Sequence, residues 1–372
     1  MANPLIAADL RLKPSQMGVL LSAFLWAYAL AQAPAGALID RLGPRRLLGG
    51  AMGLWSLAQA AAGFAGSLPQ FIAARLVLGV GEAPQFPVGA RVVRQWFEPK
   101  HRGFATGVFN SASTLAPAIG PPLVTALMLG FGWRGAFIAT GLAGFVVALI
   151  WLALYRDREA PAEREAAPPI AWRRLLAAPT LWAMALGNAG SGYMNWFYAA
   201  WLPGYLEMER HLSVPKTGWS AAIPYVFGFL GSLTGGWLCD RLAASGVTPM
   251  LSRKIPIVTG LVAGGAFTGL AILAPSDPLA IAAISAALFF ANLAGAAIWA
   301  LAVTAAPANA VASVGAIQNF GGLMGGALAP IATGLLVEAT HSFVAALAAT
   351  AVAAFGGAAI YLLGVRRAIS DA

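Results

Sequence analysis

The chain has 372 residues, of which 59% are apolar and only 10% are charged, against about a quarter in a typical soluble domain. Apolar runs of about 20 residues recur along nearly the whole length, and each is long enough to cross a hydrocarbon core of about 30 Å. These features exclude a soluble globular protein and predict an all-α protein that spans the membrane many times.

The formal net charge of +9 reflects membrane topology. When the loops are assigned alternately to the two sides, 17 of the 23 Lys and Arg residues fall on one side and Arg75 falls within a span. The other five are Arg11, Lys13, Arg134, Arg210 and Lys216. The rich side is cytoplasmic by the positive-inside rule. The charge therefore predicts a multi-pass inner-membrane protein in contact with the lipid bilayer, with no nucleic-acid partner.

The sequence offers little for a metal or a cofactor. The single Cys239 excludes an intramolecular disulfide, and the three histidines fall near predicted helix ends, far apart in sequence. We predict neither a metal site nor a cofactor. No His/Asp/Glu constellation and no nucleophile beside a base is found in the spans, so an enzyme is not expected either.

Five spans are predicted in the first half, and they cover residues 17–38, 47–66, 70–93, 104–129 and 135–155. On the first of them Tyr28 and Gln32 are four residues apart and share a helix face. Two interpretations stay open for this pair: residues that line a binding site, or ordinary polar residues of helix packing.

The third span contains Arg75 and Glu82, two charges inside an apolar, glycine-rich segment. Seven residues are close to two helical turns, so the two side chains lie on one face, roughly 10.5 Å apart along the axis. A charge at mid-membrane costs at least about 2.5 kcal/mol, which predicts a functional site. A structural ion pair is the alternative. An anionic ligand on the arginine and a proton on the glutamate fit the spacing.

Glycine and proline surround this pair. Gly79 and Gly81 remove side-chain bulk, and Pro84 and Pro87 leave backbone carbonyls one turn earlier without their donors. We therefore expect a helix that can bend and that neighbouring helices can approach closely.

Residues 156–174 are polar and proline-containing, and are predicted to be a cytoplasmic linker. Six spans follow, at 178–206, 217–238, 255–274, 279–305, 310–337 and 343–365. The first is unusually polar, and Asn188 and Asn195 recur on one face with the neighbourhood of Tyr198, a stripe suited to hydroxyl-rich ligands. Trp299 shares a helix with Asn292, and Asn319 follows Gln318; isolated amides of this kind are more often helix-packing groups than ligands.

An internal repeat relates the two halves: GALIDRL at 36–42 recurs as GWLCDRL at 236–242. The repeat predicts two parallel, pseudo-symmetric helical bundles, at 1–155 and 175–372. Two spans precede the motif in the second half and only one in the first. We therefore expect this chain to lack a first helix, through a start placed too far downstream, and to transport poorly; a genuine eleven-helix protein is the alternative.

These residues resemble the major facilitator superfamily. The paired Gly-x-x-x-Asp-Arg loops, ARLVLGVGE and the two-half layout carry the resemblance, while SAFLWAYALAQAPAG, LGVGEAPQFP, GWRGAF and WLPGYL are similar to its anion:cation symporters for sugar acids. The resemblance implies the superfamily fold, with eleven of its twelve transmembrane helices in this chain. The family's first helix also carries an acid and an arginine that have no counterpart here.

The resemblance also implies residue roles. Arg75 would contact the substrate carboxylate, Glu82 would carry the coupling proton, and Tyr28, Trp299 and Asn319 would line the central cavity. A cytoplasmic latch would consist of Asp40, Arg41, Asp240 and Arg241. To this set the sequence pattern adds Gln32 and Asn195 as substrate-binding residues.

The function predicted from these features is proton-coupled symport of an organic anion, such as a hexonate or hexuronate, by alternating access in a monomer. Two alternatives stay open: a membrane-embedded sensor with a transporter fold, and an exporter of small amphipathic compounds. A mid-span arginine disfavours cationic compounds as cargo.

Overall fold

The structure, a computed structural model, describes residues 2–97, 102–158, 172–307 and 310–369. Within these ranges the chain is helical and contains no strand, which confirms the all-α prediction. The helices are α1 (Asn3–Leu10), α2 (Pro14–Ala62), α3 (Leu68–Glu82), α4 (Gln85–Trp96), α5 (Arg102–Leu154), α6 (Trp172–Ala177), α7 (Pro179–Met208), α8 (Val214–Ala244), α9 (Pro249–Leu273), α10 (Asp277–Ala305), α11 (Val311–Thr340) and α12 (Val344–Gly364).

Two of these helices each contain two of the predicted spans. Helix α2 bends at Gly43, where φ is 73° and ψ is 158°, and α5 bends at Gly132, where φ is 67° and ψ is 174°. Only glycine adopts these angles readily, because a Cβ would clash with the backbone. The two glycines let one continuous helical ribbon reverse direction, so the segments on either side act as separate spans.

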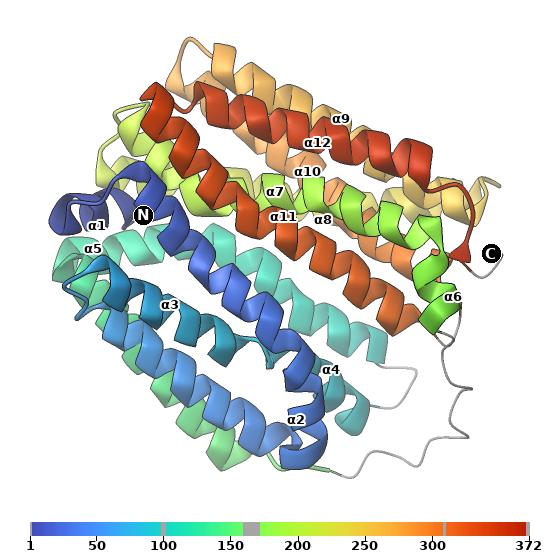
Figure 1. The fold of residues 1–372 in the computed structure, drawn as a ribbon, viewed down its shortest axis with the longest axis horizontal. Helices are drawn as coiled ribbons and strands as arrows, with labels where there is room; N and C mark the ends of the chain where they lie inside the picture. The colour runs from blue at the N-terminus through green and yellow to red at the C-terminus, as the bar shows by residue number, and fades with distance from the viewer. Residues whose placement is uncertain (1, 98–101, 159–171, 308–309, 370–372) are drawn as a thin grey trace. The chain divides into compact units, whose positions relative to one another are not determined.

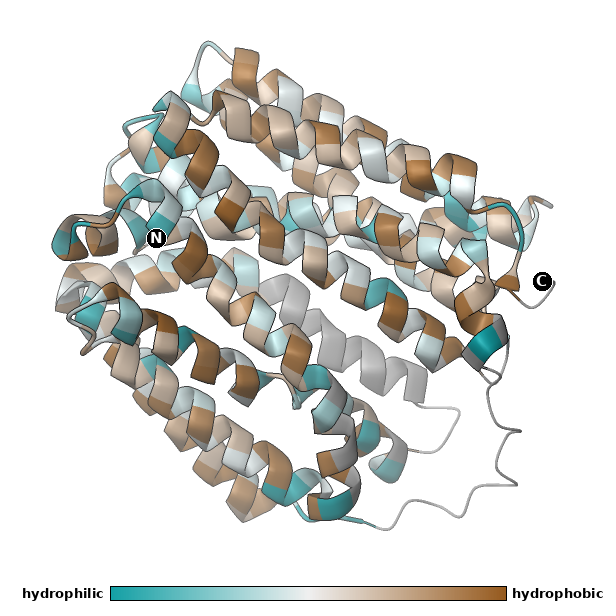
Figure 2. Cartoon of the chain, in the orientation of Figure 1, coloured by the Kyte–Doolittle hydropathy of each residue, from teal (hydrophilic) through white to brown (hydrophobic). Residues whose placement is uncertain are grey.

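Length and apolarity identify seven stretches of the described residues as candidate membrane spans. Neither α7 nor the α3–α4 stretch is among them, because α7 carries many polar residues and the other stretch is interrupted and charged. Large apolar side chains point outward along several spans; Leu154 and Leu273 are about three-quarters exposed. Figure 2 shows apolar residues along the helices, with hydrophilic ones concentrated toward helix ends and loops. This is the surface that lipid tails require.

The chain forms two compact units, residues 1–166 and 167–372. Within the first unit, α2 packs along both α3 and α5. Within the second, α7 packs against α11 and α12, and α10 packs against α8 and α9 (Figure 1). The predicted linker spans 156–174, and its residues 159–171 lie outside the described part of the chain.

In both units an arginine side chain donates hydrogen bonds to backbone carbonyls at a helix end. In the first unit Arg134 donates to the carbonyls of Gly63 and Ala65, which follow the end of α2. In the second unit Arg210 donates to the carbonyls of Ala271 and Ala274, at the end of α9. These bonds satisfy carbonyls that a helix end leaves without a partner.

Each unit has another hydrogen bond of this kind, from a basic side chain to a carbonyl at a helix end. Arg45 donates through Nε to the carbonyl of Leu152 near the end of α5, at 3.1 Å. Lys254 donates to the carbonyl of Val365, just after α12, at 2.9 Å. In each unit, therefore, basic side chains at the helix ends hold neighbouring helices together.

Candidate functional site

The two charges of the first unit lie on α3, on the stretch that the sequence predicts to be one long helix. The structure divides this stretch: α3 ends at Glu82 and α4 begins at Gln85. The division has a local cause, because Pro84 has no N–H with which to continue the hydrogen-bond ladder of α3. Glu82 therefore lies at a helix end and not in the middle of a helix.

Arg75 is half-buried and is surrounded by aromatic rings. Its guanidinium carbon lies 5.6 Å from the centre of the Phe71 ring and 5.4 Å from the centre of the Phe137 ring. Its Nε is buried without a hydrogen-bond partner among the described residues. Ring faces stabilise a cation but leave its N–H groups unsatisfied, so this guanidinium retains capacity for an acceptor.

Glu82 connects Arg75 to the two polar residues of α2. Glu82 interacts electrostatically with Arg75 and with Tyr28, and the hydroxyl of Tyr28 is hydrogen-bonded to the side chain of Gln32. All four side chains are partly buried. The structure thus brings Arg75, Glu82, Tyr28 and Gln32 into one cluster within the first unit.

The glycines next to this cluster permit close packing on both sides of α3. A Cβ on Gly79 would lie 2.9 Å from the backbone nitrogen of Tyr28, and one on Gly81 would lie 3.0 Å from the backbone nitrogen of Trp55. Tyr28 precedes the Gly43 bend of α2 and Trp55 follows it. Helix α3 is therefore held between the two segments of α2, as the sequence predicts for a helix that others approach closely.

The predicted residues of the second unit lie on three helices. Asn195 on α7 donates to the carbonyl of Ser191 in its own helix, at 3.0 Å. Trp299 on α10 is 56% exposed, and Asn319 on α11 is partly buried. Tyr198, the third member of the stripe on α7, is buried and hydrogen-bonded to Thr268 of α9 at 2.8 Å. It is a packing residue and is not available to a ligand.

Sequence reasoning predicted Gln318 only as a packing amide and did not identify the helices that it joins. Gln318 donates through its amide to the carbonyl of Ile298 at 3.0 Å, and its own carbonyl accepts from Asn188 at 2.9 Å. Gln318 thereby fastens α11 to α10 and to α7, directly before Asn319 and beside Trp299. The sequence signal was its position next to Asn319, and the general expectation that isolated amides serve helix packing holds for Gln318 and Asn188.

The residues predicted to form a cytoplasmic latch have unequal surroundings. The side chain of Asp40 lies outside the described part of the structure, and Arg41 is exposed. Asp240 lies 3.8 Å from Arg253 in an ion pair, and the guanidinium of Arg241 lies 5.6 Å from the centre of the Trp237 ring. Each of these two contacts is made within the second unit.

The titratable residues do not suggest a metal centre. In the described ranges, no three side chains of His, Cys, Asp or Glu gather closely enough to hold an ion. The chemistry available at the Arg75 cluster is therefore that of a cation, a carboxyl group, a phenol and an amide, which together can bind an anion and exchange a proton.

The family model described as the Major Facilitator Superfamily matches residues 1–330. The chain belongs to the major facilitator superfamily. It is accordingly a multi-pass transport protein of the bacterial inner membrane and not an enzyme.

Named relatives of this superfamily member cover nearly all of the chain. It is 41% identical to the "Probable L-galactonate transporter" of Escherichia coli (strain K12), over 100% of this chain and 85% of the relative. It is 31% identical to the "Hexuronate transporter" of Bacillus subtilis (strain 168), over 96% of this chain and 88% of the relative.

A "D-galactonate transporter" of Escherichia coli O6:H1 is 30% identical over 97% of this chain and 89% of the relative. Among solved structures, a bacterial homologue of the human lysosomal transporter Spinster matches with a TM-score of 0.86 at 19% identity, over 100% of this chain and 93% of that one. That likeness confirms the superfamily fold.

Proposed function

We propose that this superfamily member is a proton-coupled symporter of a sugar acid and that it works by alternating access, with its site open to one side of the membrane at a time. The observation that carries the proposal is Arg75, a half-buried cation with an Nε that lacks a partner among the described residues. The printed names of the relatives, which include galactonate and hexuronate transporters, support a sugar acid as the cargo.

Arg75 would bind the carboxylate of the sugar acid. A guanidinium offers two parallel donors in the geometry that a carboxylate accepts, and the rings of Phe71 and Phe137 hold it without consuming those donors. Tyr28 and Gln32, which are bonded to each other near Glu82, would serve the hydroxyl groups of the sugar chain. In the second unit we propose Asn195, Trp299 and Asn319 as further substrate-binding residues.

Glu82 would bind and release the coupling proton. It interacts electrostatically with Arg75, so an anion that neutralises Arg75 removes a charge that favours the ionised form of Glu82. Substrate binding would then favour protonation of Glu82, and release of the substrate would favour loss of the proton. This reciprocal effect is the physical basis of symport.

The experiment uses vesicles that contain the full chain or its Glu82→Gln variant. The variant should exchange labelled galactonate for unlabelled galactonate at a rate close to that of the unmodified protein, because Gln keeps the shape of the protonated acid. It should not accumulate galactonate against its gradient when a pH gradient is imposed. Retained uphill accumulation would contradict the assignment of Glu82.

A matched control is Glu209→Gln, since Glu209 accepts hydrogen bonds from Ser342 and Phe343 within the second unit and is not a member of the Arg75 cluster. This variant should keep both exchange and accumulation in proportion to the amount of folded protein. A loss of accumulation with intact exchange in this control would show that the effect is not specific to Glu82.

A further inference from the structure

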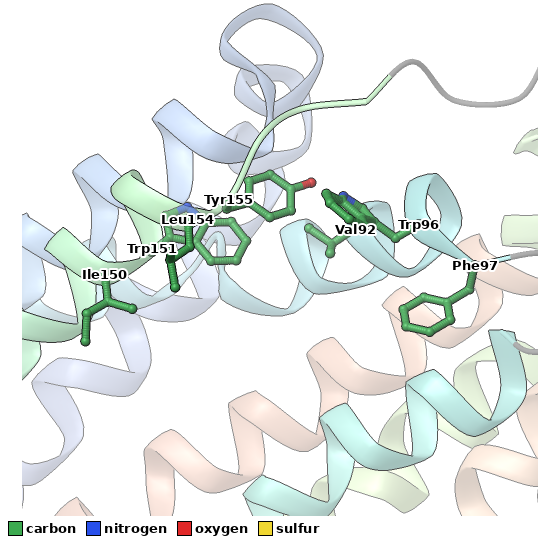
Figure 3. Close-up of a pocket in the computed structure, with 7 residues that line it drawn as sticks. All are labelled: Val92, Trp96, Phe97, Ile150, Trp151, Leu154 and Tyr155. Atoms are coloured by element: carbon green, nitrogen blue, oxygen red, sulfur yellow. The ribbon is translucent and has the colours of Figure 1, made fainter.

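A pocket lies in the first unit, between the last two turns of α4 and the end of α5 (Figure 3). Its volume is about 370 Å³. Its lining is apolar or aromatic and consists of Val92, Trp96, Phe97, Ile150, Trp151, Leu154 and Tyr155. None of these residues belongs to the Arg75 cluster.

The polar atoms of this lining are already occupied. Trp151 donates through Nε1 to the carbonyl of Arg45 at 3.1 Å, and the hydroxyl of Tyr155 donates to Gln95 at 3.1 Å. Trp96 is hydrogen-bonded to Tyr155 in turn. A polar ligand would therefore give up its hydrogen bonds to water and find no partner inside the pocket. A hydrocarbon chain makes no such bonds and gives up none on entering. The part of an occupant that enters must be apolar.

The edge of the pocket has the opposite character. The guanidinium carbon of Arg158 lies 3.9 Å from the centre of the Trp96 ring, and the side chain of Arg158 is exposed. The ring fixes the guanidinium at the edge of the pocket and leaves its N–H groups directed to other acceptors. The part of an occupant that stays outside must therefore carry negative charge.

The position along the membrane normal identifies the molecule that combines these two parts. The span in α5 ends at Leu154, which is 77% exposed, and Arg156 and Arg158 follow on the side that the charge rule assigns to the cytoplasm. The pocket thus crosses the boundary between hydrocarbon and headgroups. Anionic phospholipids are enriched in the cytoplasmic leaflet and bind at basic sites on this side of membrane proteins.

We infer that the pocket between α4 and α5 binds an anionic phospholipid of the cytoplasmic leaflet, with one acyl chain against Trp96, Trp151 and Leu154 and with its phosphate at Arg158. The lipid would join the end of α4 to the end of α5. This site is separate from the proposed transport site and does not depend on the transported substrate.

The test is native mass spectrometry of the full chain in detergent, titrated with phosphatidylglycerol or with phosphatidylcholine of the same acyl chains. We expect phosphatidylglycerol to bind more tightly. Replacing Arg158 by Gln should weaken the phosphatidylglycerol adduct about fivefold and the phosphatidylcholine adduct by less, because the choline cation offsets the charge of its phosphate. The matched control is Arg156→Gln, which removes a charge two residues away that does not lie against Trp96 and should have no such effect.

The acyl pocket is tested independently by Ile150→Trp, which adds bulk to a lining position that is already half exposed, with Leu149→Trp as its non-lining neighbour. The first variant should weaken both lipids and the second should weaken neither. Glycerol phosphate, which has the headgroup without the chains, should not compete.

Three outcomes would overturn the inference: equal binding of the two lipids by the unmodified protein, an equal loss in Arg156→Gln and Arg158→Gln, or competition by glycerol phosphate. The two comparisons between ligands use only the unmodified protein, so they decide the matter even if a variant does not fold.

Discussion

The α3–α4 stretch of the first unit and α10 of the second differ in how they pack against their neighbours. Helix α3 carries its own glycines, Gly79 and Gly81, and receives the backbone of α2 against them. At the contact of α10 with α8 the glycines belong to the other helix. Gly231 and Gly235 of α8 lie against the backbone of α10 at Phe289 and Leu293. Both arrangements bring helices close together, but with the small residues on opposite partners.

The same two elements differ in charge and continuity. Helix α10 is unbroken over its 29 residues, and Asp277 at its first position is its only charged residue. The α3–α4 stretch holds Arg75 and Glu82 and is interrupted after Glu82. A repeated architecture thus uses one unit for an apolar packing helix and the other for a charged, interrupted one. Of the two elements, the one in the first unit therefore holds the partly buried charges.

Replacing Arg75 by Lys should have the largest effect, because it keeps the charge but removes the planar pair of donors. We expect galactonate to bind between about 10-fold and 100-fold more weakly, as for the loss of one charged hydrogen bond. Isothermal calorimetry on the purified protein measures this. The control, Arg366→Lys, alters an exposed arginine that donates to the carbonyl of Leu363 and should leave the affinity unchanged. Unchanged binding by Arg75→Lys would mean that the paired donors of Arg75 do not bind the carboxylate, and the charged stretch would then not distinguish the first unit.

Glycine substitutions give a second test of whether the two units contribute differently to galactonate binding. Adding a methyl group in Gly79→Ala or Gly231→Ala places a Cβ too close to the backbone of Phe24 or of Phe289 and forces the helices apart, so each change should lower stability by about 1–3 kcal/mol. Only Gly79→Ala should also weaken galactonate binding, since it displaces the backbone of Tyr28. Thermal unfolding and calorimetry of both variants provide the two readouts.

The matched control is Gly50→Ala in α2, where nothing lies within 4 Å of the added atom. It should be neutral or stabilising by about 0.5–1 kcal/mol, because alanine is the better helix former. If Gly231→Ala weakened galactonate binding as much as Gly79→Ala, the second unit would contribute equally and the comparison would be wrong.

The sequence reveals the elements of this asymmetry but not their arrangement. Arg75 and Glu82 stand out because charges are costly in an apolar span, and glycine spacing predicts close packing. The aromatic rings around Arg75 were not predictable, since Phe137 is 62 positions away and one apolar residue among many in its span. Gln318 was predicted only as a generic packing amide, because a sequence does not tell which carbonyl an amide will reach.

The sequence predicts that the α3–α4 stretch can bend, but not that one helix ends there and another begins. Pro84 and Pro87 mark where hydrogen bonds are lost, yet many transmembrane helices contain proline and remain continuous, as α9 does at Pro256. Whether a proline bends a helix or ends it depends on whether neighbouring segments supply the missing contacts.

Replacing Pro84 by Ala should make the α3–α4 stretch more like α10. Alanine restores an N–H that can bond to the carbonyl of Val80, so amides around residues 83–88 should exchange with deuterium about fivefold more slowly. Hydrogen–deuterium exchange with mass spectrometry measures this, and peptides of α10 serve as the internal reference. Unaltered exchange at 83–88 would show that packing against α2, and not the missing donor, causes the break.

Replacing Asp240 by Asn should have the smallest effect on stability. Its partner Arg253 lies 3.8 Å away, but the side chain of Asp240 is 83% exposed, so water screens the pair and we expect a change below about 1 kcal/mol. Arg253→Ala should cost more, about 1–3 kcal/mol, because Arg253 also donates to the carbonyl of Cys239 at 2.8 Å and to the hydroxyl of Ser252 at 2.9 Å, and both bonds are lost with the side chain.

Thermal unfolding of the two variants therefore distinguishes the stability supplied by the hydrogen bonds of Arg253 from that supplied by its ion pair with Asp240. Equal destabilisation would mean that the charge of Asp240 supplies the stability. The transport rate adds a separate test of the proposed latch: if Asp240 holds the cytoplasmic side closed in one state, Asp240→Asn should change the rate of galactonate exchange while its stability stays within that small range. An unchanged exchange rate in folded Asp240→Asn would remove Asp240 from the latch and leave Arg253 as a structural residue of the second unit.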